Sequence, residues 1–322
     1  MKKNFSFFIY LLFVVSMVGC SSQQDKKNAE ETPAITTNSQ PKNFERVAPP
    51  HLMTNTQDRA VYMLEHFWDH FDFRDTMYWV AQENSNRPSV AEQALVDFLT
   101  ISFLASPDKI SHSIKKMLDS AEVDVTMYNY FYKTGEHYLY DPNSPMRNDG
   151  LFIPFLEHVI TSTKVLEDSK VLPKYQLNLA YRNRVGAKAQ DLVYTLNSGA
   201  TGNLYSIKAN YVLLMFYNPD CVQCLQTRND VKNSTVISEA ISSGNLKVLA
   251  VYPDEKLDIW KNHLNDIPPT WINGYDKDLA VRTKEIYDLK AIPTLYLLDK
   301  DKKVLLKDIS VRTIHEYLES VK

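Results

Sequence analysis

Hydrophobic and polar positions divide the chain into four stretches with different patterns. Residues 5–18 are almost entirely apolar, whereas residues 21–50 consist mainly of Ser, Gln, Asn, Lys, Glu, Thr and Pro. From about residue 54 to residue 165, apolar side chains recur at three- and four-residue spacing, which predicts amphipathic helices. Beyond about residue 186, short apolar runs alternate with turn residues, which predicts strands and helices in alternation.

The periodic stretch predicts a compact helical domain. Thr54–Gln57 and Ser89–Glu92 have the spacing of capping boxes, so we expect a helix to begin at each, the first continuing through Phe71. Further helices are expected from Pro107 and over residues 123–140, 149–162 and 172–184.

Two groups of side chains in this domain are candidates for a site. An aromatic group can line a groove, but core packing is the commoner role and is expected here; it comprises Tyr128, Tyr130, Phe131 and Tyr132. A second group suggests a metal site, but its histidines lack the Glu of a His-Glu-x-x-His motif; it comprises His66, Asp69, His70 and Asp72. We expect these four residues to lie on the surface and assign no metal.

The last part of the chain predicts an α/β sandwich. Every residue of Tyr211–Tyr217 is apolar or aromatic, which suits a strand buried on both faces of a sheet. Leu246–Tyr252 predicts a second buried strand, while Thr294–Asp299 and Val304–Lys307 predict an antiparallel pair. Another hairpin is expected around the turn at 197–202, and an amphipathic helix ends the chain.

A Cys-x-x-Cys pair follows the strand at Tyr211–Tyr217. Asn218 and Pro219 end that strand, and a helix-compatible run follows Cys224, so both cysteines are expected at a helix N-terminus. Unpaired N–H groups and the helix dipole stabilise a thiolate at Cys221 there. Cys224, one turn later, can then attack a mixed disulfide formed by Cys221. The pattern predicts the redox site of a thioredoxin-like protein.

The N-terminus has the pattern of a bacterial lipoprotein signal. Lys2 and Lys3 precede the apolar run, which ends in a small residue directly before Cys20. The run is short for a transmembrane helix, which needs about 20 residues. We expect cleavage before Cys20 and a lipid on this residue; an uncleaved N-terminal anchor is the alternative. Either way the body of the protein is expected to be exported and tethered to a membrane.

Composition narrows the function further. The 322 residues carry a formal net charge of −3, which makes nucleic acid an unexpected partner. Of three cysteines, Cys20 is assigned to the lipid, which leaves only Cys221 and Cys224. A disulfide that closes such a short loop adds little stability, so a redox role is favoured over a structural one.

Residues 186–322 resemble the membrane-anchored thioredoxin-like reductases of the TlpA and ResA type. The matching segments are Gly186–Asp191, the apolar strand leading into Cys221–Cys224, and Tyr287–Thr294. The helical region, with Tyr140–Pro145, resembles a domain of unknown function that precedes such modules in Gram-negative lipoproteins. The family's fold is expected here, with Pro293 in a cis-proline loop facing the cysteines.

The resemblance also implies partners and a location. Protein disulfides would be the substrates, a membrane thiol-reducing transporter would be the electron donor, and no cofactor would be required. Ser21 after the lipidated cysteine is compatible with sorting to the outer membrane. We therefore expect a lipid anchor in the cell envelope, with the folded body in the periplasm or at the cell surface.

Two positions depart from the thioredoxin pattern. Asp220 stands where thioredoxins usually have Trp, and Met215 stands where they place a buried acid. The charge of Asp220 opposes formation of the Cys221 thiolate, and a less stable thiolate makes the dithiol a better reductant. The sequence therefore favours a disulfide reductase over a strong oxidant.

Three other functions are weaker alternatives. A binding or scaffold lipoprotein would leave the cysteines without a catalytic role. A peroxidase of this fold normally has Thr or Ser where this chain has Asn218. A zinc site would need more than the two ligands of one Cys-x-x-Cys.

The predicted organisation has four parts. A signal peptide occupies residues 1–19 and a disordered tether residues 20–51. A helical domain of unknown function spans residues 52–170, and a thioredoxin-like domain spans residues 171–322.

Overall fold

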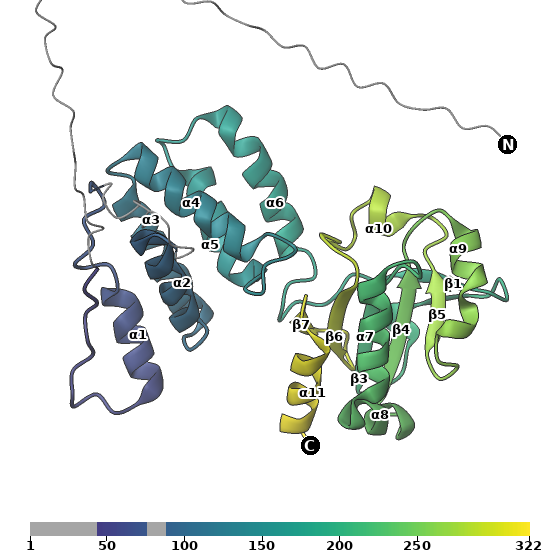
Figure 1. The fold of residues 1–322 in the computed structure, drawn as a ribbon. Coiled ribbons are helices and arrows are strands. Elements are labelled where there is room, and N and C mark those ends of the chain that lie inside the picture. The colour runs from purple at the N-terminus through teal and green to yellow at the C-terminus, as the bar shows by residue number, and fades with distance from the viewer. Residues whose placement is uncertain (1–43, 76–87) are drawn as a thin grey trace, which may run out of the picture. The chain divides into compact units, whose positions relative to one another are not determined.

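The computed structural model describes residues 44–75 and 88–322 (Figure 1). The expected signal peptide, Cys20 and most of the expected tether lie outside the described residues. None of the helices in the described ranges combines the length and apolar character that crossing a lipid bilayer requires.

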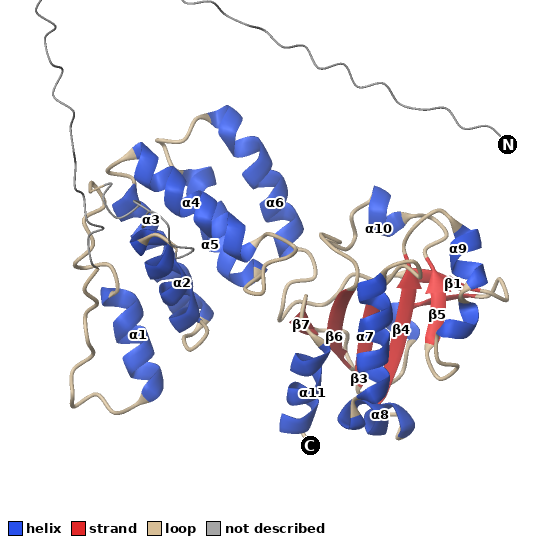
Figure 2. Cartoon of the chain, viewed as in Figure 1, coloured by secondary structure: helices blue, strands red, loops and turns tan. Residues whose placement is uncertain are grey.

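The helical domain packs around an apolar core, as predicted. Its helices are α1 (Thr56–His66), α2 (Val90–Ser102), α3 (Pro107–Ala121), α4 (Val125–Leu139), α5 (Asp149–Thr161) and α6 (Val171–Tyr181), shown in blue in Figure 2. Helix α5 is buried along most of its length and contacts α3, α4 and α6. A helix that is apolar on nearly every side has to lie inside such a bundle. Helix α6 packs on α5 and so continues the helical layer beyond residue 170.

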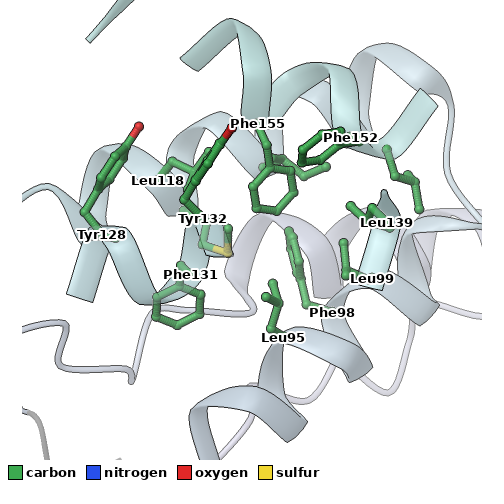
Figure 3. Packing of buried hydrophobic residues seen from close by; sticks show 14 of the residues in the cluster. Leu95, Phe98, Leu99, Leu118, Tyr128, Phe131, Tyr132, Leu139, Phe152 and Phe155 are labelled. Atoms are coloured by element: carbon green, nitrogen blue, oxygen red, sulfur yellow. The ribbon is translucent and has the colours of Figure 1, made fainter. Parts of the chain in front are cut away.

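The aromatic residues of α4 belong to this core. Tyr128, Phe131 and Tyr132 are buried and lie among leucines of α2 and α3 and the rings of Phe152 and Phe155 (Figure 3). The prediction of core packing is confirmed for these three residues, whereas Tyr130 is partly buried and packs against the edge of the same core.

Helix α1 differs from its prediction at both ends. Asn55, not Thr54, is the N-cap, and its side-chain oxygen accepts the N–H groups of Gln57 and Asp58. Asn is a better N-cap than Thr, which explains the shift. The helix ends at His66, so Phe71 lies outside it. The chain turns there, and Phe71 packs edge-on against Trp68 with 5.2 Å between ring centroids.

Helix α2 begins as predicted. The Ser89 hydroxyl accepts the N–H of Glu92 at 3.1 Å, which satisfies one of the unpaired donors of the first turn. Helices α3, α4 and α5 cover the segments predicted for them.

Seven strands of the described residues form one mixed sheet in the order β2-β1-β5-β4-β3-β6-β7. They are β1 (Val193–Leu196), β2 (Thr201–Asn203), β3 (Tyr211–Phe216), β4 (Leu246–Tyr252), β5 (Ile272–Tyr275), β6 (Thr294–Asp299) and β7 (Val304–Lys307). Strand β3 runs parallel to β4 and antiparallel to β6. The predicted buried strands and both hairpins are present.

Both faces of the sheet are covered by apolar side chains. Leu213 and Met215 of β3 face a core that includes residues of α7 (Val222–Asn233), α8 (Thr235–Ser242), α9 (Leu257–Asn262) and α11 (Val311–Ser320). Leu214 and Phe216 face the opposite core, which includes Val281 of α10 (Ala280–Thr283). Alternation along a strand buried on both faces produces these two layers. The expected thioredoxin-like α/β sandwich is confirmed.

Strand β5 was not predicted. Its Asn273-Gly274 pair is typical of a turn, yet it pairs with β4 on one side and β1 on the other. Gly274 suits this position because a Cβ there would lie 3.0 Å from the Tyr194 ring and 3.2 Å from the Thr195 carbonyl oxygen, which is a tight approach.

Candidate active site

Cys221 and Cys224 lie at the start of helix α7. Cys221 is the N-cap residue and is partly exposed, and its sulfur accepts the N–H of Cys224 at 3.3 Å. An N–H donor and the positive end of the helix dipole both favour negative charge on this sulfur. Both cysteines are free thiols. The geometry suits Cys221 for nucleophilic attack.

The second sulfur has a different environment. Cys224 is 3% exposed and belongs to the core beneath α7. Burial raises the pKa of the Cys224 thiol well above its ordinary value, and the N–H of Asn218, 3.5 Å from the sulfur, offsets only part of that effect. The buried Cys224 thiol is therefore held in its protonated form, whereas the partly exposed Cys221 thiol can be reached by a substrate.

The loop before β6 reaches the same edge of the sheet. Phe216 at the end of β3 pairs with Thr294 at the start of β6, so the residues after β3 and those before β6 lie together. The peptide bond between Ile292 and Pro293 is cis, and the Cys221 thiol donates to the Ile292 carbonyl oxygen at 3.5 Å. The register of two antiparallel strands thus brings together all three residues predicted for the described part of the site.

Asp220, which precedes Cys221 in the chain, belongs to a surface group of polar side chains. Asp220 is largely exposed, and its carboxylate lies 3.8 Å from Nε2 of His263. His263 Nδ1 also lies 2.9 Å from the Asp266 carboxylate. The negative charge that the sequence places beside Cys221 is thus one member of a small surface group. No motif in the sequence indicated His263.

Met215 occupies the position at which thioredoxins have a buried acid, and its surroundings are apolar. Met215 is buried in the same core as Cys224. Arg228, four residues after Cys224 on α7, is 13% exposed, and its positive charge favours a thiolate at Cys224. Sequence reasoning did not identify Arg228, because an isolated Arg on a helix is an ordinary surface residue.

A pocket of about 490 Å³ opens beside the Cys-x-x-Cys loop, with Asn218 in its wall. Asp254 in the same wall accepts from the Asn218 side chain at 3.2 Å and pairs with Arg282 at 3.0 Å. The wall also contains the apolar side chains of Ile259 and Leu279, so its character is mixed.

The candidate metal residues near α1 form a different arrangement. His66 Nδ1 lies 2.7 Å from the Asp69 carboxylate, and both side chains are well exposed. Within residues 44–75 and 88–322, no three His, Cys, Asp or Glu side chains gather as a metal site.

Two protein families match the chain. Residues 19–183 match a family described as a domain of unknown function, DUF5106, and residues 209–304 match a family described as thioredoxin-like. No curated protein matches the chain.

Solved structures are similar to it as well. The crystal structure of a thioredoxin-like protein from Bacteroides caccae ATCC 43185 is 44% identical, with 87% of this chain and 99% of that chain covered and a TM-score of 0.81. The C-terminal domain of an uncharacterized protein from Bacteroides fragilis NCTC 9343 is 50% identical, with 42% and 98% covered and a TM-score of 0.42. A domain of a possible thiol-disulfide isomerase from Cytophaga hutchinsonii ATCC 33406 is 27% identical, with 44% and 95% covered and a TM-score of 0.39.

Proposed function

The chain belongs to the thioredoxin-like proteins that carry an N-terminal DUF5106 domain, and from this premise we propose that it reduces protein disulfides. One observation carries the proposal. The sulfur of Cys221 is partly exposed at a helix N-terminus and accepts an N–H bond from Cys224, whose own sulfur is buried directly behind it. Disulfide exchange of this kind needs one accessible thiol that attacks the substrate and a second, protected thiol that resolves the mixed disulfide.

The reaction has two exchange steps. The Cys221 thiolate attacks one sulfur of the substrate disulfide, whose S–S bond breaks, and the departing substrate sulfur takes up a proton. Cys224 then gives up its proton and attacks the Cys221 sulfur, which releases the second substrate thiol. The protein is left with a Cys221–Cys224 disulfide, and two electrons have passed to the substrate. The positive charge of Arg228 favours the Cys224 thiolate in the second step.

The surroundings of Cys221 suit a polypeptide substrate. Val222 and Leu225 are well exposed next to it and offer apolar contacts. The segment Ala291–Pro293 contacts the Cys221 sulfur through the Ile292 carbonyl oxygen, where it can meet the main chain of a bound peptide. This arrangement is the reason to propose proteins with disulfides as substrates, and the N-terminal signal pattern is the reason to propose exported ones.

Direction and location belong to the same proposal. Asp220 beside Cys221 disfavours the thiolate and so favours a reducing dithiol. A membrane thiol-reducing transporter would regenerate the dithiol. A lipid on Cys20 would tether the chain in the cell envelope, with the outer membrane favoured, and the support for this is the sequence of residues 2–21.

The test uses the full chain in detergent, with insulin as the disulfide substrate and dithiothreitol as the reductant. Wild type should accelerate insulin reduction, and Cys221→Ser should reduce the rate to that of dithiothreitol alone. Cys224→Ser, reduced beforehand and then freed of dithiothreitol, should instead trap a mixed disulfide with insulin at Cys221, detectable as a mass increase. If Cys221→Ser leaves the rate unchanged, the proposal fails and a binding or scaffold role becomes the better one.

A further inference from the structure

A buried lysine stands three residues before Pro293, in the loop that touches Cys221. The Lys290 side chain is 7% exposed, and its ammonium lies 2.6 Å from the Asp149 carboxylate and 3.0 Å from that of Asp288. Asp149 is the first residue of helix α5 in the helical domain. The segment Lys290–Pro293, called the redox loop below, is therefore ion-paired to a residue outside the thioredoxin-like domain. Both partners belong to the compact unit that residues 41–322 form.

The charges around this contact are balanced. Lys307 of β7 binds the other oxygen of Asp149, and Arg147 pairs with Asp308 at 3.3 Å. With Lys290 and Asp288, the group contains three basic and three acidic side chains, all mostly buried. Charges shielded from water interact strongly, and removing one of them leaves its partner buried without compensation. Such a group fixes the position of whatever main chain carries it.

The helical domain also holds the segment that leads to Lys290. Arg182 donates to the carbonyl oxygen of Lys284 at 3.1 Å, and the Asn183 side chain donates to that of Ile286 at 2.7 Å. The Tyr140 ring lies 4.4 Å from the Lys290 ammonium. The helical domain and the segment that connects it to the sheet therefore contact the chain at several points between Lys284 and Lys290.

The path from Lys290 to the reactive sulfur is short. Only Ala291 separates Lys290 from Ile292, whose carbonyl oxygen accepts from the Cys221 thiol. A shift of Lys290 is therefore transmitted to the atom in contact with the sulfur.

We propose that Asp149 is a positioning residue of the redox site, which holds the Ile292–Pro293 segment against Cys221 through its ion pair with Lys290. The proposal rests on the proposed function in that Cys221 is taken as the reactive thiol. It gives the helical domain a definite role, which is to set the geometry of a site that it does not itself contain.

The test compares two lysines that bind the same carboxylate. Lys290→Met removes the contact from the redox loop, whereas Lys307→Met removes the equivalent contact from β7. Lys290→Arg keeps the charge in the loop. The primary measurement is the rate at which iodoacetamide modifies Cys221 in the reduced full chain, as a function of pH, because this rate requires no substrate. Insulin reduction is the second.

Lys290→Met should change the Cys221 alkylation rate by at least about threefold and lower kcat/KM for insulin roughly tenfold, because a displaced loop misplaces the reacting groups. Lys290→Arg should remain within about twofold of wild type, and so should Lys307→Met. Circular dichroism establishes that each variant is folded. If Lys290→Met does not fold, Asp149→Asn, which preserves the shape of the side chain, should show the same changed alkylation rate.

Two results would overturn the proposal. One is an unchanged alkylation rate in folded Lys290→Met or Asp149→Asn. The other is an equal change in Lys290→Met and Lys307→Met, which would mean that domain packing in general, and not the loop, affects Cys221. A wild-type chain that alkylates at Cys221 but reduces no disulfide would refute only the proposed function, and the comparison of alkylation rates would still decide the positioning role.

Discussion

The main-chain N–H of Cys224 donates to the sulfur of Cys221 over 3.3 Å, while the sulfur of Cys224 itself is buried. One turn of helix therefore supplies both a group that stabilises negative charge on the first sulfur and an enclosed position for the second. The two thiols differ in reactivity because of this relationship, although they are only three residues apart in the sequence.

Selective alkylation should reveal that difference. Burial raises the pKa of Cys224, so at pH 8 its thiolate fraction is far smaller than that of an ordinary cysteine. Each unit of pKa above the pH lowers this fraction about tenfold, so Cys224 should react at least about tenfold more slowly than Cys221. Brief treatment of the reduced chain with iodoacetamide, followed by peptide mass spectrometry, measures both rates. Equal rates in the folded protein would contradict the burial of Cys224, and equal rates in urea are the control.

Removing the charge of Asp220 should make Cys221 more reactive. The exposed carboxylate repels a thiolate on the neighbouring residue, and Asp220→Asn removes that repulsion. We expect the Cys221 alkylation rate at pH 7 to rise roughly threefold, because solvent and salt screen an exposed charge. The pair should also become a weaker reductant, which equilibration with dithiol buffers measures. Asp266→Asn, which removes the other carboxylate beside His263, is the matched control and should change the rate less. If Cys221 is alkylated more slowly in Asp220→Asn than in wild type, the Asp220 charge does not destabilise the thiolate and the prediction is wrong.

The site was predictable where a local motif carries it. Cys221 and Cys224 follow a long apolar strand, and Pro293 directly precedes another, so their positions relative to the strands were predictable. Their meeting depends on the pairing of Phe216 with Thr294, which the separate strand predictions did not give; only the resemblance to thioredoxin-like proteins implied that the proline loop faces the cysteines.

Long-range polar contacts were not predictable in this way. Asp149 and Lys290 are 141 residues apart, and although Lys290 lies in the Tyr287–Thr294 segment, nothing in the sequence indicates that the two residues pair. Strand β5 escaped prediction because Asn273-Gly274 has the composition of a turn, and only its neighbours β1 and β4 make it a strand. Tertiary contacts, and not the local composition, determine both the ion pair and the strand.

The ion pair of Lys290 should make stability depend on alkaline pH. Burial lowers the pKa of Lys290, but the carboxylates of Asp149 and Asp288 outweigh burial and raise it from 10.5 to about 12. A raised pKa in the folded state means that the contribution to stability is complete below about pH 10.5 and is lost as the pH rises through about 12. Other charged or titratable groups near Lys290 are Asp308 and Tyr140.

Urea unfolding of wild type and Lys290→Met tests this dependence. At pH 7 the variant should be less stable by about 3 kcal/mol, since it leaves buried carboxylates short of one partner. The difference between the two proteins should be constant up to about pH 10.5 and shrink above it. Lys133→Met, which removes an exposed lysine paired with Glu136, should change stability by no more than about 0.5 kcal/mol. If the difference in free energy of unfolding between wild type and Lys290→Met grows as the pH rises, the Lys290 ion pair does not stabilise the folded state in the way proposed.

Replacing Gly135 should destabilise the helical domain. A Cβ at this position of α4 would lie 2.5 Å from the ring of Phe155, which is fully buried and so has little room to move. Gly135→Ala gains about 1 kcal/mol in helix propensity but should lose more through overpacking, for a net destabilisation of about 1–2 kcal/mol. Thermal unfolding measures it, and Lys133→Ala on the exposed face of the same helix is the control. An equal or higher stability for Gly135→Ala would show that the Phe155 ring moves aside, and hence that the packing of α4 on α5 tolerates a methyl group.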